Sequence, residues 1–419
     1  MLAQETLEQL QTPCYLYDLD LFEGNLDAFA QAFSEAWRPG EAHTCYSVKT
    51  APVAGLLKIA RAHGWGAEAV SDEEYDLARR CGFAPEEIVF NGPVKSREKL
   101  FEALRDGALV NLDSWREVEW ACDYAQARQN GAPARVGLRV KPGAPTNQSS
   151  TTPSEQQFIG ETRSRFGFDA SNGDLQRAVS KLRAAGIEPY ALHIHVIDRA
   201  RDYHAHRQAA RLLCSIINDL QLNDLGAIDM GGGYIGGGAH RDRYERYAKD
   251  IANILAEAVN PASCALVTEP GGSILGCTGN LVGRVVDTRE ADGTVFVTTE
   301  LSTLHLNPTR GNANPRPYEV LYTKDAHSPA LGQLKQDSRQ ACTADARPKA
   351  PHQIVGGFTC MEQDRLYELF EEPRLCEGDV ICIRDVGAYA QALAPRFFIR
   401  DAPPSYGLHA DGSVTPLEL

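Results

Sequence analysis

Short apolar segments alternate with longer amphipathic ones over the first two thirds of this chain, and this alternation constrains the fold more than any other feature. The apolar segments have strand length, and most of the stretches between them carry a helical pattern. The expected strands are 44–48, 66–70, 88–90, 109–112, 136–140, 191–197, 226–230 and 265–268. About eight such strand and helix units close a parallel (β/α)8 TIM barrel. The sequence therefore predicts an α/β fold of this type.

The sequence pattern changes after about residue 275. The segments LVGRVVDT, TVFVTTEL, HQIVGGFT and GDVICIRDVGAY read as strands with few helical patterns between them. We therefore expect two domains. Residues 20–275 form the barrel, and residues 1–19 together with 276–419 form a β-rich domain.

Two polar, irregular segments interrupt these patterns, at 141–163 and 323–350. The first follows the end of a barrel strand, where barrel enzymes place substrate loops, so it is either a lid or a surface excursion. The second reads as an insertion within the β-rich domain.

Composition excludes several classes of function. The 419 residues carry a formal charge of −14 and no dense basic patch, which argues against nucleic acid and anionic membrane as partners. The N-terminus lacks the features of a signal peptide, so we expect a cytoplasmic protein. The eleven cysteines are scattered without a CxxC pair, which argues against a disulfide framework and a structural zinc site.

Reactive side chains fall where the expected barrel strands end, which is where barrel enzymes gather their catalytic groups. Lys49 ends the first strand, His195 the sixth and Glu269 the eighth, while Gly231, Gly232 and Gly233 follow the seventh. The glycines can bring backbone N–H groups close to an anion, and phosphate sites commonly form late in such a barrel. We therefore expect one site that binds a phosphate-bearing cofactor.

Pyridoxal phosphate requires what these residues offer. Lys49 is an amine for a Schiff base, the glycines can hold the phosphate, Glu269 can keep the pyridine nitrogen protonated, and His195 can stack on the ring. Each residue has an ordinary structural explanation when taken alone. Their joint placement at strand ends favours the cofactor.

The chain as a whole resembles the fold-type III pyridoxal-phosphate decarboxylases, the family that includes diaminopimelate and ornithine decarboxylases. The resemblance covers nearly the whole chain and implies an alanine racemase-like barrel followed by a β domain. The motifs that carry it are, in the family's order, TPCYLYD, YSVKT, FNGPVKS, NLDS, SRFGF, DMGGGY, EPGG, GGFTCMEQD and GDVICIRDVGAYAQ.

The resemblance implies the same roles for Lys49, His195, the three glycines and Glu269. It adds Cys360 as the residue that returns a proton to the α carbon, and Tyr389 as a phosphate contact. Glu68 matches an acidic residue near the Schiff base, where a carboxylate can hold the lysine's charge. It further implies a homodimer with shared active sites, because the cysteine loop of such enzymes enters the neighbouring subunit's site.

This sequence departs from the family pattern at four places that bear on substrate. Gly272 stands where the family has arginine, and Met361 follows Cys360 where diamino-acid decarboxylases have an acidic residue. Asp198 stands where the family has a serine whose hydroxyl approaches the phosphate, and we expect its carboxylate to turn away or to bind a cationic substrate. Arg310 and Arg316 are candidate anchors for a substrate carboxylate. We therefore expect a larger or conjugated amino acid rather than a simple diamino acid.

Three alternatives remain open from the residues. An amino-acid racemase shares the barrel and the lysine, although the Cys360 loop favours decarboxylation. A metal-dependent hydrolase would use His193 and His195, which lie two apart on an expected strand, with His204 and His206 as a second pair. The third is a cofactor-binding protein that has lost catalysis, which the presence of both Lys49 and Cys360 disfavours.

Overall fold

The computed structural model describes residues 4–127, 134–142, 164–197, 203–306, 316–323, 341–342 and 347–418. The chain divides into two compact units. Residues Glu23–Ile274 form one, and Met1–Phe22 together with Leu275–Leu419 form the other. Most of the segment 141–163, expected as a lid or a surface excursion, and most of the expected insertion at 323–350 lie outside the described residues.

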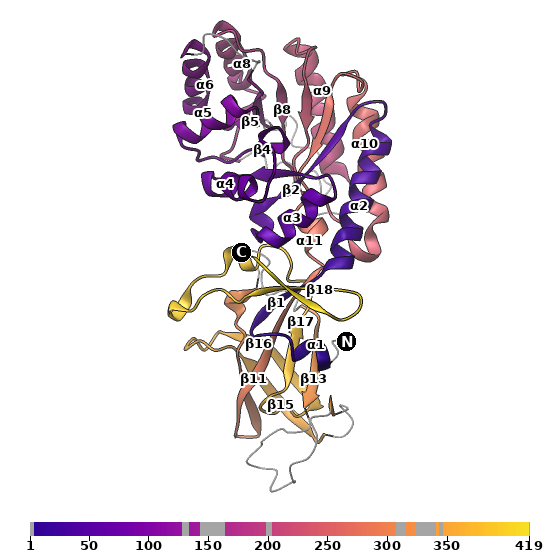
Figure 1. Cartoon of the computed structure of the whole chain (residues 1–419), viewed down its shortest axis with the longest axis vertical. Helices are drawn as coiled ribbons and strands as arrows, with labels where there is room; N and C mark the ends of the chain where they lie inside the picture. Colours follow the sequence, from indigo (N-terminus) through magenta and orange to yellow (C-terminus); the bar gives the residue numbers. More distant parts are fainter. Residues whose placement is uncertain are drawn as a thin grey trace. The chain divides into compact units, whose positions relative to one another are not determined.

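The first unit is a closed barrel of eight parallel strands surrounded by helices, so the expected TIM barrel is confirmed (Figure 1). The sheet closes because β10 pairs with β2 and β5 pairs with β6. The barrel strands are β2 Ala42–Ser47, β3 Gly66–Ala69, β4 Ile88–Phe90, β5 Leu109–Leu112, β6 Val136–Lys141, β8 Ala191–His193, β9 Ala227–Asp229 and β10 Ala265–Thr268. The two-residue strand β7, Phe168–Asp169, pairs with β6 beside the barrel.

The helices alternate with these strands along the chain, as the apolar periodicity requires. They are α2 Leu19–Ala36, α3 Ala54–Ala62, α4 Asp72–Arg80, α5 Arg97–Asp106, α6 Trp115–Ala127, α8 Asp174–Ala184, α9 His204–Asp219, α10 Asp242–Leu255 and the short α11 Gly272–Leu275. Ser71 and Ser96 cap α4 and α5 by accepting hydrogen bonds from the backbone N–H groups of Glu74 and Lys99. Gly107 ends α5 with a φ of 99°.

One expected strand, 191–197, is shorter in the structure. Strand β8 ends at His193, so His195 lies two residues beyond it. The turn that contains Gly231 and Gly233 packs against the backbone of this segment, and a Cβ on Gly233 would lie 1.7 Å from the carbonyl oxygen of Val196. The segment therefore leaves the barrel ladder to make room for the turn.

The second unit is built mainly from strands. Its sheet has the order β14-β13-β17-β11-β1-β18-β19, with β12, β15 and β16 paired successively onto β11. The strands are β1 Cys14–Asp18, β11 Gly279–Ala291, β12 Thr294–Thr299, β13 Tyr318–Thr323, β14 Ala341–Cys342, β15 Lys349–Gly356, β16 Arg365–Pro373, β17 Val380–Ile383, β18 Ser405–Leu408 and β19 Val414–Leu417, and the helix is α1 Gln4–Leu7.

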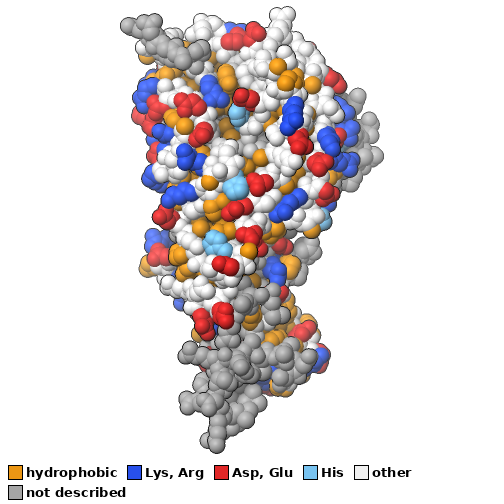
Figure 2. All heavy atoms as spheres, turned by 45° about the vertical axis from the view of Figure 1, so that its right-hand side comes forward, with side chains coloured by type: hydrophobic (Ala, Val, Ile, Leu, Met, Phe, Trp, Pro, Cys, Tyr) orange, Lys and Arg blue, Asp and Glu red, His pale blue; other side chains and the backbone are white. Residues whose placement is uncertain are grey.

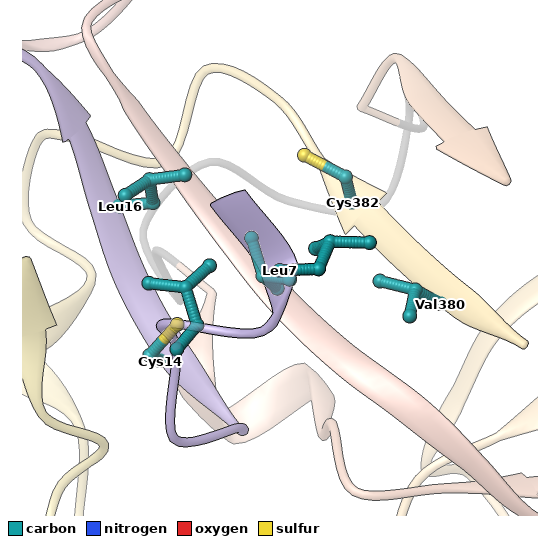
Figure 3. Close-up of a cluster of buried hydrophobic side chains, with 7 residues drawn as sticks. Leu7, Cys14, Leu16, Val380 and Cys382 are labelled. Atoms are coloured by element: carbon teal, nitrogen blue, oxygen red, sulfur yellow. The ribbon is translucent and has the colours of Figure 1, made fainter. Parts of the chain in front are cut away.

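The N-terminus of the chain is part of this second unit. Strand β1 lies between β11 and β18, antiparallel to the first and parallel to the second. Leu7, Cys14 and Leu16 pack against Val380 and Cys382 in a buried apolar cluster (Figure 3). Burial of these side chains joins segments that are more than 350 residues apart in the sequence.

The barrel interior has an apolar layer and, one pleat further along the strands, a polar layer. The apolar layer consists of Cys45, Val89, Leu109, Ala191, Ala227 and Val267. Two residues after each of these stands a buried polar residue, namely Ser47, Asn91, Asn111, His193, Asp229 and Glu269. Residues two apart on a strand face the same side, so the second set continues inward-facing rows toward the carboxyl ends of the strands.

None of the helices within the described ranges combines the length and apolar character needed to span a membrane. On the face drawn in Figure 2, acidic and basic side chains are interspersed over the described residues.

Candidate active site

Lys49 lies in a 3₁₀ turn, Val48–Thr50, that directly follows strand β2. The turn is held by the hydroxyl of Tyr46, which donates to the carbonyl oxygen of Ala51 at 2.7 Å. Lys49 Nζ donates to Ser47 Oγ at 2.9 Å and forms an ion pair with Glu68 Oε2. The amine is therefore held in a defined position at the carboxyl end of the strand.

Glu68 connects this amine to the other side of the barrel. The carboxylate is buried, and its Oε2 also accepts a hydrogen bond from Ser47 Oγ at 2.7 Å. Its Oε1 accepts from Asn91 Nδ2 at 3.1 Å, and the same Nδ2 donates to Glu269 Oε1 at 2.6 Å. Lys49 and Glu269 thus belong to one hydrogen-bonded network.

Asn111 and Asp229 complete this network. Asn111 Nδ2 donates to Asn91 Oδ1 and to Asp229 Oδ2, both at 2.9 Å. Burial raises the pKa of Asp229 to about 7, and burial together with Asp229 and Glu68 holds the pKa of Glu269 well above its ordinary value. Three buried carboxylates face one lysine, so the site favours an additional proton or another positive charge.

His195 and the glycine turn lie together beyond strands β8 and β9. Gly232 N donates to His195 Nδ1 at 3.2 Å, and Gly231 N donates to Asp229 Oδ1 at 2.9 Å. Two of the three amides expected to hold phosphate therefore already have partners within the chain. Burial, with the nearby Lys49 and Arg139, lowers the pKa of His195 to about 3, so its imidazole is neutral at physiological pH.

The glycine turn cannot carry side chains. Gly231 and Gly233 have φ values of 61° and 84°, which favour glycine. A Cβ on Gly232 would lie 2.5 Å from the carbonyl oxygen of Glu269. The turn thus brings bare backbone up to the ends of strands β8 and β10.

The histidines expected for a metal site are not arranged as the hydrolase alternative requires. Ligand atoms of His193, Asp229 and Glu269 lie within 4.8 Å of one another, but His195 is not part of this group. His206 lies on α9, where it stacks on Tyr234 and its Nε2 donates to the carbonyl oxygen of Gly232 at 3.0 Å. His204 is hydrogen-bonded to Gln208 on the same helix.

Two ion pairs support the polar layer from the next strand ends. Lys95 and Glu117 are fully buried and lie 3.1 Å apart. Arg139, on β6, pairs with Asp113 at 2.8 Å. Burial lowers the pKa of Lys95, while Glu117 opposes this shift. These pairs hold the residues that follow β4 and β5.

The Cys360 loop belongs to the second unit and connects β15 to β16. Cys360 is exposed and Met361 is partly exposed, whereas Asp364 is 3% exposed. Asp364 accepts hydrogen bonds from the backbone N–H and hydroxyl of Thr303, both at 2.8 Å, and from Thr359 Oγ1 at 2.7 Å. The hydroxyl of Ser302 adds a further bond at 3.0 Å. A single carboxylate thus holds this loop against residues 302–303.

Tyr389 and Arg316 also lie in the second unit. Tyr389 is partly buried and has a φ of 57°. It follows Gly387, which packs so tightly that an added Cβ would lie 2.0 Å from the carbonyl oxygen of Leu275. Arg316 Nη1 donates to the carbonyl oxygen of Asp385. The other two expected substrate contacts, Arg310 and Asp198, lie outside the described residues.

Gly272 differs from its neighbour Gly271 in its surroundings. A Cβ on Gly271 would lie 2.1 Å from Thr50 Oγ1, whereas a Cβ on Gly272 would meet no described atom within 4 Å. Packing therefore requires glycine at position 271 but not at position 272.

Sequence reasoning missed Asn91, Asn111 and Asp229, and it considered His193 only as a metal ligand. A signal for these residues was present. Each stands two positions after an apolar residue of an expected strand, and so on the inward face. A polar residue in that row at a carboxyl strand end indicates a site.

Comparison with known proteins decides the family. Residues 21–276, well over half of the chain, match the family model described as "Pyridoxal-dependent decarboxylase, pyridoxal binding domain". The chain belongs to this family. It is therefore a pyridoxal-phosphate-dependent decarboxylase, and both the racemase and the metal-dependent hydrolase alternatives are wrong.

Similar proteins match this decarboxylase over nearly its full length. The diaminopimelate decarboxylase of Helicobacter pylori strain J99 is 25% identical over 94% of this chain and 89% of its own. That of Aquifex aeolicus is 27% identical over 95% and 86%. The structure of diaminopimelate decarboxylase from M. jannaschii in complex with L-lysine has a TM-score of 0.78 at 20% identity, covering 99% of this chain and 91% of that one. The structural likeness shows the shared fold.

The charges of the site fit the cofactor of this family. A pyridinium nitrogen supplies the positive charge that the buried Asp229 and Glu269 favour. Lys49 supplies the amine, and the neutral ring of His195 can lie against an aromatic ring. The residues of the barrel therefore suit pyridoxal phosphate.

Proposed function

We propose that this decarboxylase removes the α-carboxylate of an amino acid, using Lys49, Glu269 and His195 in the barrel and Cys360 in the β-rich unit. The observation that carries the proposal is the network from Lys49 through Glu68 and Asn91 to Glu269. It places an amine and a proton-holding carboxylate at the carboxyl end of one barrel. When bound, the cofactor supplies the electron sink that stabilises the charge left on the α carbon.

Each barrel residue has a separate task in this proposal. Lys49 Nζ would hold the cofactor through its aldehyde group, and Glu68 would balance the charge of that nitrogen. Glu269 would keep the ring nitrogen protonated, because a pyridinium would balance the negative charge that burial and the neighbouring acids disfavour on this carboxylate. His195 stacks as a neutral imidazole whose Nδ1 accepts from Gly232, so its own proton is on Nε2.

The β-rich unit supplies the remaining groups in this proposal. Cys360 returns a proton to the α carbon from its Sγ, and Tyr389 contacts the phosphate together with Gly233. The cysteine loop acts in the partner's site of a homodimer. Exposed apolar side chains in the same unit, Leu393, Phe398 and Ile399, support an interface between copies.

The substrate proposal rests on Met361 and Gly272. A thioether beside Cys360 cannot pair with a distal ammonium group, and Gly272 leaves space where an arginine could stand. We therefore propose a larger or conjugated amino acid, with Arg310, Arg316 or Asp198 contacting its polar groups. The second candidate is a diamino acid, which the names of the curated relatives favour.

A substrate panel with carbon dioxide release as the readout tests this proposal. It should contain meso-diaminopimelate, lysine, ornithine, arginine and N-acylated or otherwise conjugated derivatives of each. We expect the highest kcat/KM for a conjugated substrate and a rise in diamino-acid turnover for Met361→Glu. Fast turnover of meso-diaminopimelate by the wild type would establish the second candidate instead.

Cys360→Ala and Cys360→Ser separate protonation from loop structure. We expect both variants to bind the cofactor normally, with kcat reduced roughly 10²- to 10⁴-fold, because a positioned general acid contributes that much. Wild-type rates in Cys360→Ala would remove Cys360 from the proposal.

A further inference from the structure

We infer that Asn91 and Asn111 form a positioning pair that couples protonation at the Lys49 end of the site to protonation at the Glu269 end. The inference rests on the proposed function, since it concerns the same cofactor site. Both side chains are buried, at 3% and 1% exposure, and they come from adjacent strand ends. Neither ionises, so their effect is exerted through the carboxylates that they contact.

The orientation of the Asn91 amide follows from its partners. Nδ2 donates its two hydrogens to Glu68 Oε1 and Glu269 Oε1, and Oδ1 accepts from Asn111. The reversed amide would place its carbonyl oxygen against two carboxylates, which can only accept when ionised. Asn91 is therefore a double donor that bridges two acids.

Asn111 extends the same arrangement to a third acid. One hydrogen of its Nδ2 goes to Asn91 and the other to Asp229 Oδ2. Asp229 Oδ1 accepts from Gly231 N, so both oxygens of Asp229 are engaged as acceptors. A hydrogen bond between Asp229 and Glu269 lowers the pKa of Asp229 and raises the pKa of Glu269, so the proton that these acids favour is directed toward Glu269.

A neutral amide suits this task better than a cation. Lysine or arginine at position 91 would neutralise the acids and lower their pKa values, and the site would lose its preference for a positively charged ring. The amide instead fixes which oxygens point inward and leaves the excess negative charge in place. A change of charge at Glu68 then alters the strength of the hydrogen bond from Asn91 to Glu269. A change of charge at Glu269 likewise alters the bond from Asn91 to Glu68.

The backbone behind both asparagines is clamped by one buried lysine. Lys95 Nζ donates to the carbonyl oxygens of Gly92 and Asn111, at 2.7 and 3.1 Å. On the opposite side, Gly137 leaves room for Asn111, because a Cβ there would lie 2.0 Å from Asn111 Oδ1. Lys95 thus fixes the backbone near both asparagines, and the missing side chain of Gly137 leaves space for the side chain of Asn111.

The test compares buried-amide variants in the reconstituted enzyme. Asn91→Leu removes the two donors, Asn91→Asp replaces them with a negative charge, and Asn111→Leu removes the second bridge. Asn25→Leu is the matched control. Asn25, on α2, is also a fully buried amide, but its Nδ2 donates to the carbonyl oxygen of Ile274, and its Oδ1 accepts from Gly238 N and Arg241 Nε rather than contacting the three acids.

Two measurements distinguish failure of the inference from failure of the proposed function. Borohydride reduction followed by peptide mass spectrometry shows whether the cofactor is bound to Lys49. A pH titration of the visible absorbance of the bound cofactor reports its protonation. If wild type gives no reduced Lys49 adduct, the proposed function is overturned.

Given that adduct, we expect the titration midpoint to rise in Asn91→Leu and to rise further in Asn91→Asp, by roughly one pH unit or more, because lost donors and added negative charge favour protonation. Asn111→Leu should shift it less, in the same direction. We expect kcat to fall roughly 10- to 100-fold in Asn91→Leu, as misplacement of a reacting group does, with a smaller change in KM.

Asn25→Leu should reduce the free energy of unfolding about as much as Asn91→Leu does, but it should leave the midpoint of the pH titration unchanged. Midpoints of Asn91→Leu and Asn91→Asp equal to that of wild type would overturn the inference, as would an equal shift in Asn25→Leu. If Asn91→Leu fails to fold, Asn91→Asp, which keeps the side chain's size, decides the question.

Discussion

The acids of the barrel and the acid of the Cys360 loop are both buried, yet their pKa values shift in opposite directions. Burial raises the pKa of Asp229, and neighbouring acids add to burial at Glu269. Burial also raises the pKa of Asp364, but hydrogen bonds from Thr303, Thr359 and Ser302 outweigh it and lower the value overall. The barrel acids thus lack enough positive charge nearby, whereas the carboxylate of Asp364 is stabilised by hydrogen-bond donors of the residues around it. The first arrangement is suited to a charged ligand and the second to a fixed loop shape.

The largest expected effect is at the barrel amine. Lys49→Ala should abolish the visible absorbance of bound cofactor and lower kcat/KM by roughly 10³-fold or more, because the covalent nucleophile is lost. Absorbance and carbon dioxide release measure this. Lys249→Ala is the control, since Lys249 forms an exposed pair with Glu245 and should behave as wild type. Equal cofactor absorbance in Lys49→Ala and wild type would contradict the assignment.

The next effect is on stability. Lys95→Met leaves Glu117 buried without its partner and should lower the free energy of unfolding by about 3–5 kcal/mol, as breaking a buried ion pair does. Urea denaturation measures the loss. Lys95→Met combined with Glu117→Gln should recover part of it. A loss below about 1 kcal/mol in the single variant would show that this pair does not anchor the barrel network.

A smaller effect is expected in the Cys360 loop. Asp364→Ala leaves the hydroxyls of Ser302, Thr303 and Thr359 without their acceptor and should cost about 1–3 kcal/mol. Alkylation of Cys360, followed by peptide mass spectrometry, should become faster as the loop loosens. Asp411→Ala, at an exposed turn, is the control. Unchanged alkylation in Asp364→Ala would mean that other contacts hold the loop.

The smallest effect is the pH dependence of the protein without cofactor. The pKa of Asp229 rises from 3.8 to about 7 on folding, so the native state binds more protons between these values and this carboxyl's contribution to stability falls as pH rises. Asp229→Asn should therefore flatten stability over about pH 4 to 7. Asp364, with its lowered pKa, contributes stability above pH 3.8 that is lost as pH falls through its native pKa.

Asp364→Asn should accordingly reduce the loss of stability in acid. Denaturation midpoints measured across pH 2 to 8 check both variants. If stability changes with pH equally in Asp229→Asn and wild type, Asp229 does not differ from Asp364 in the way proposed.

The repeating pattern of the first 270 residues was sufficient to predict the barrel. Six of its strands begin where expected, at residues 66, 88, 109, 136, 191 and 265. The pattern overestimated the length of strand β8, because apolar periodicity cannot reveal the glycine turn that packs against residues 194–197. The prediction assigns residues 1–19 to the β-rich domain, but local apolar patterns do not show which strands β1 pairs with, because β11 and β18 lie hundreds of residues away.

The sequence by itself determined the barrel class, the amine at the end of the first barrel strand and, through the family motifs, the cofactor. Only the tertiary structure decided that Asn91 bridges Glu68 and Glu269, and that Asp229 has a shifted pKa. The physical reason is that strand periodicity is a local property of the chain. Hydrogen bonds and desolvation instead depend on which strand ends meet when the barrel closes.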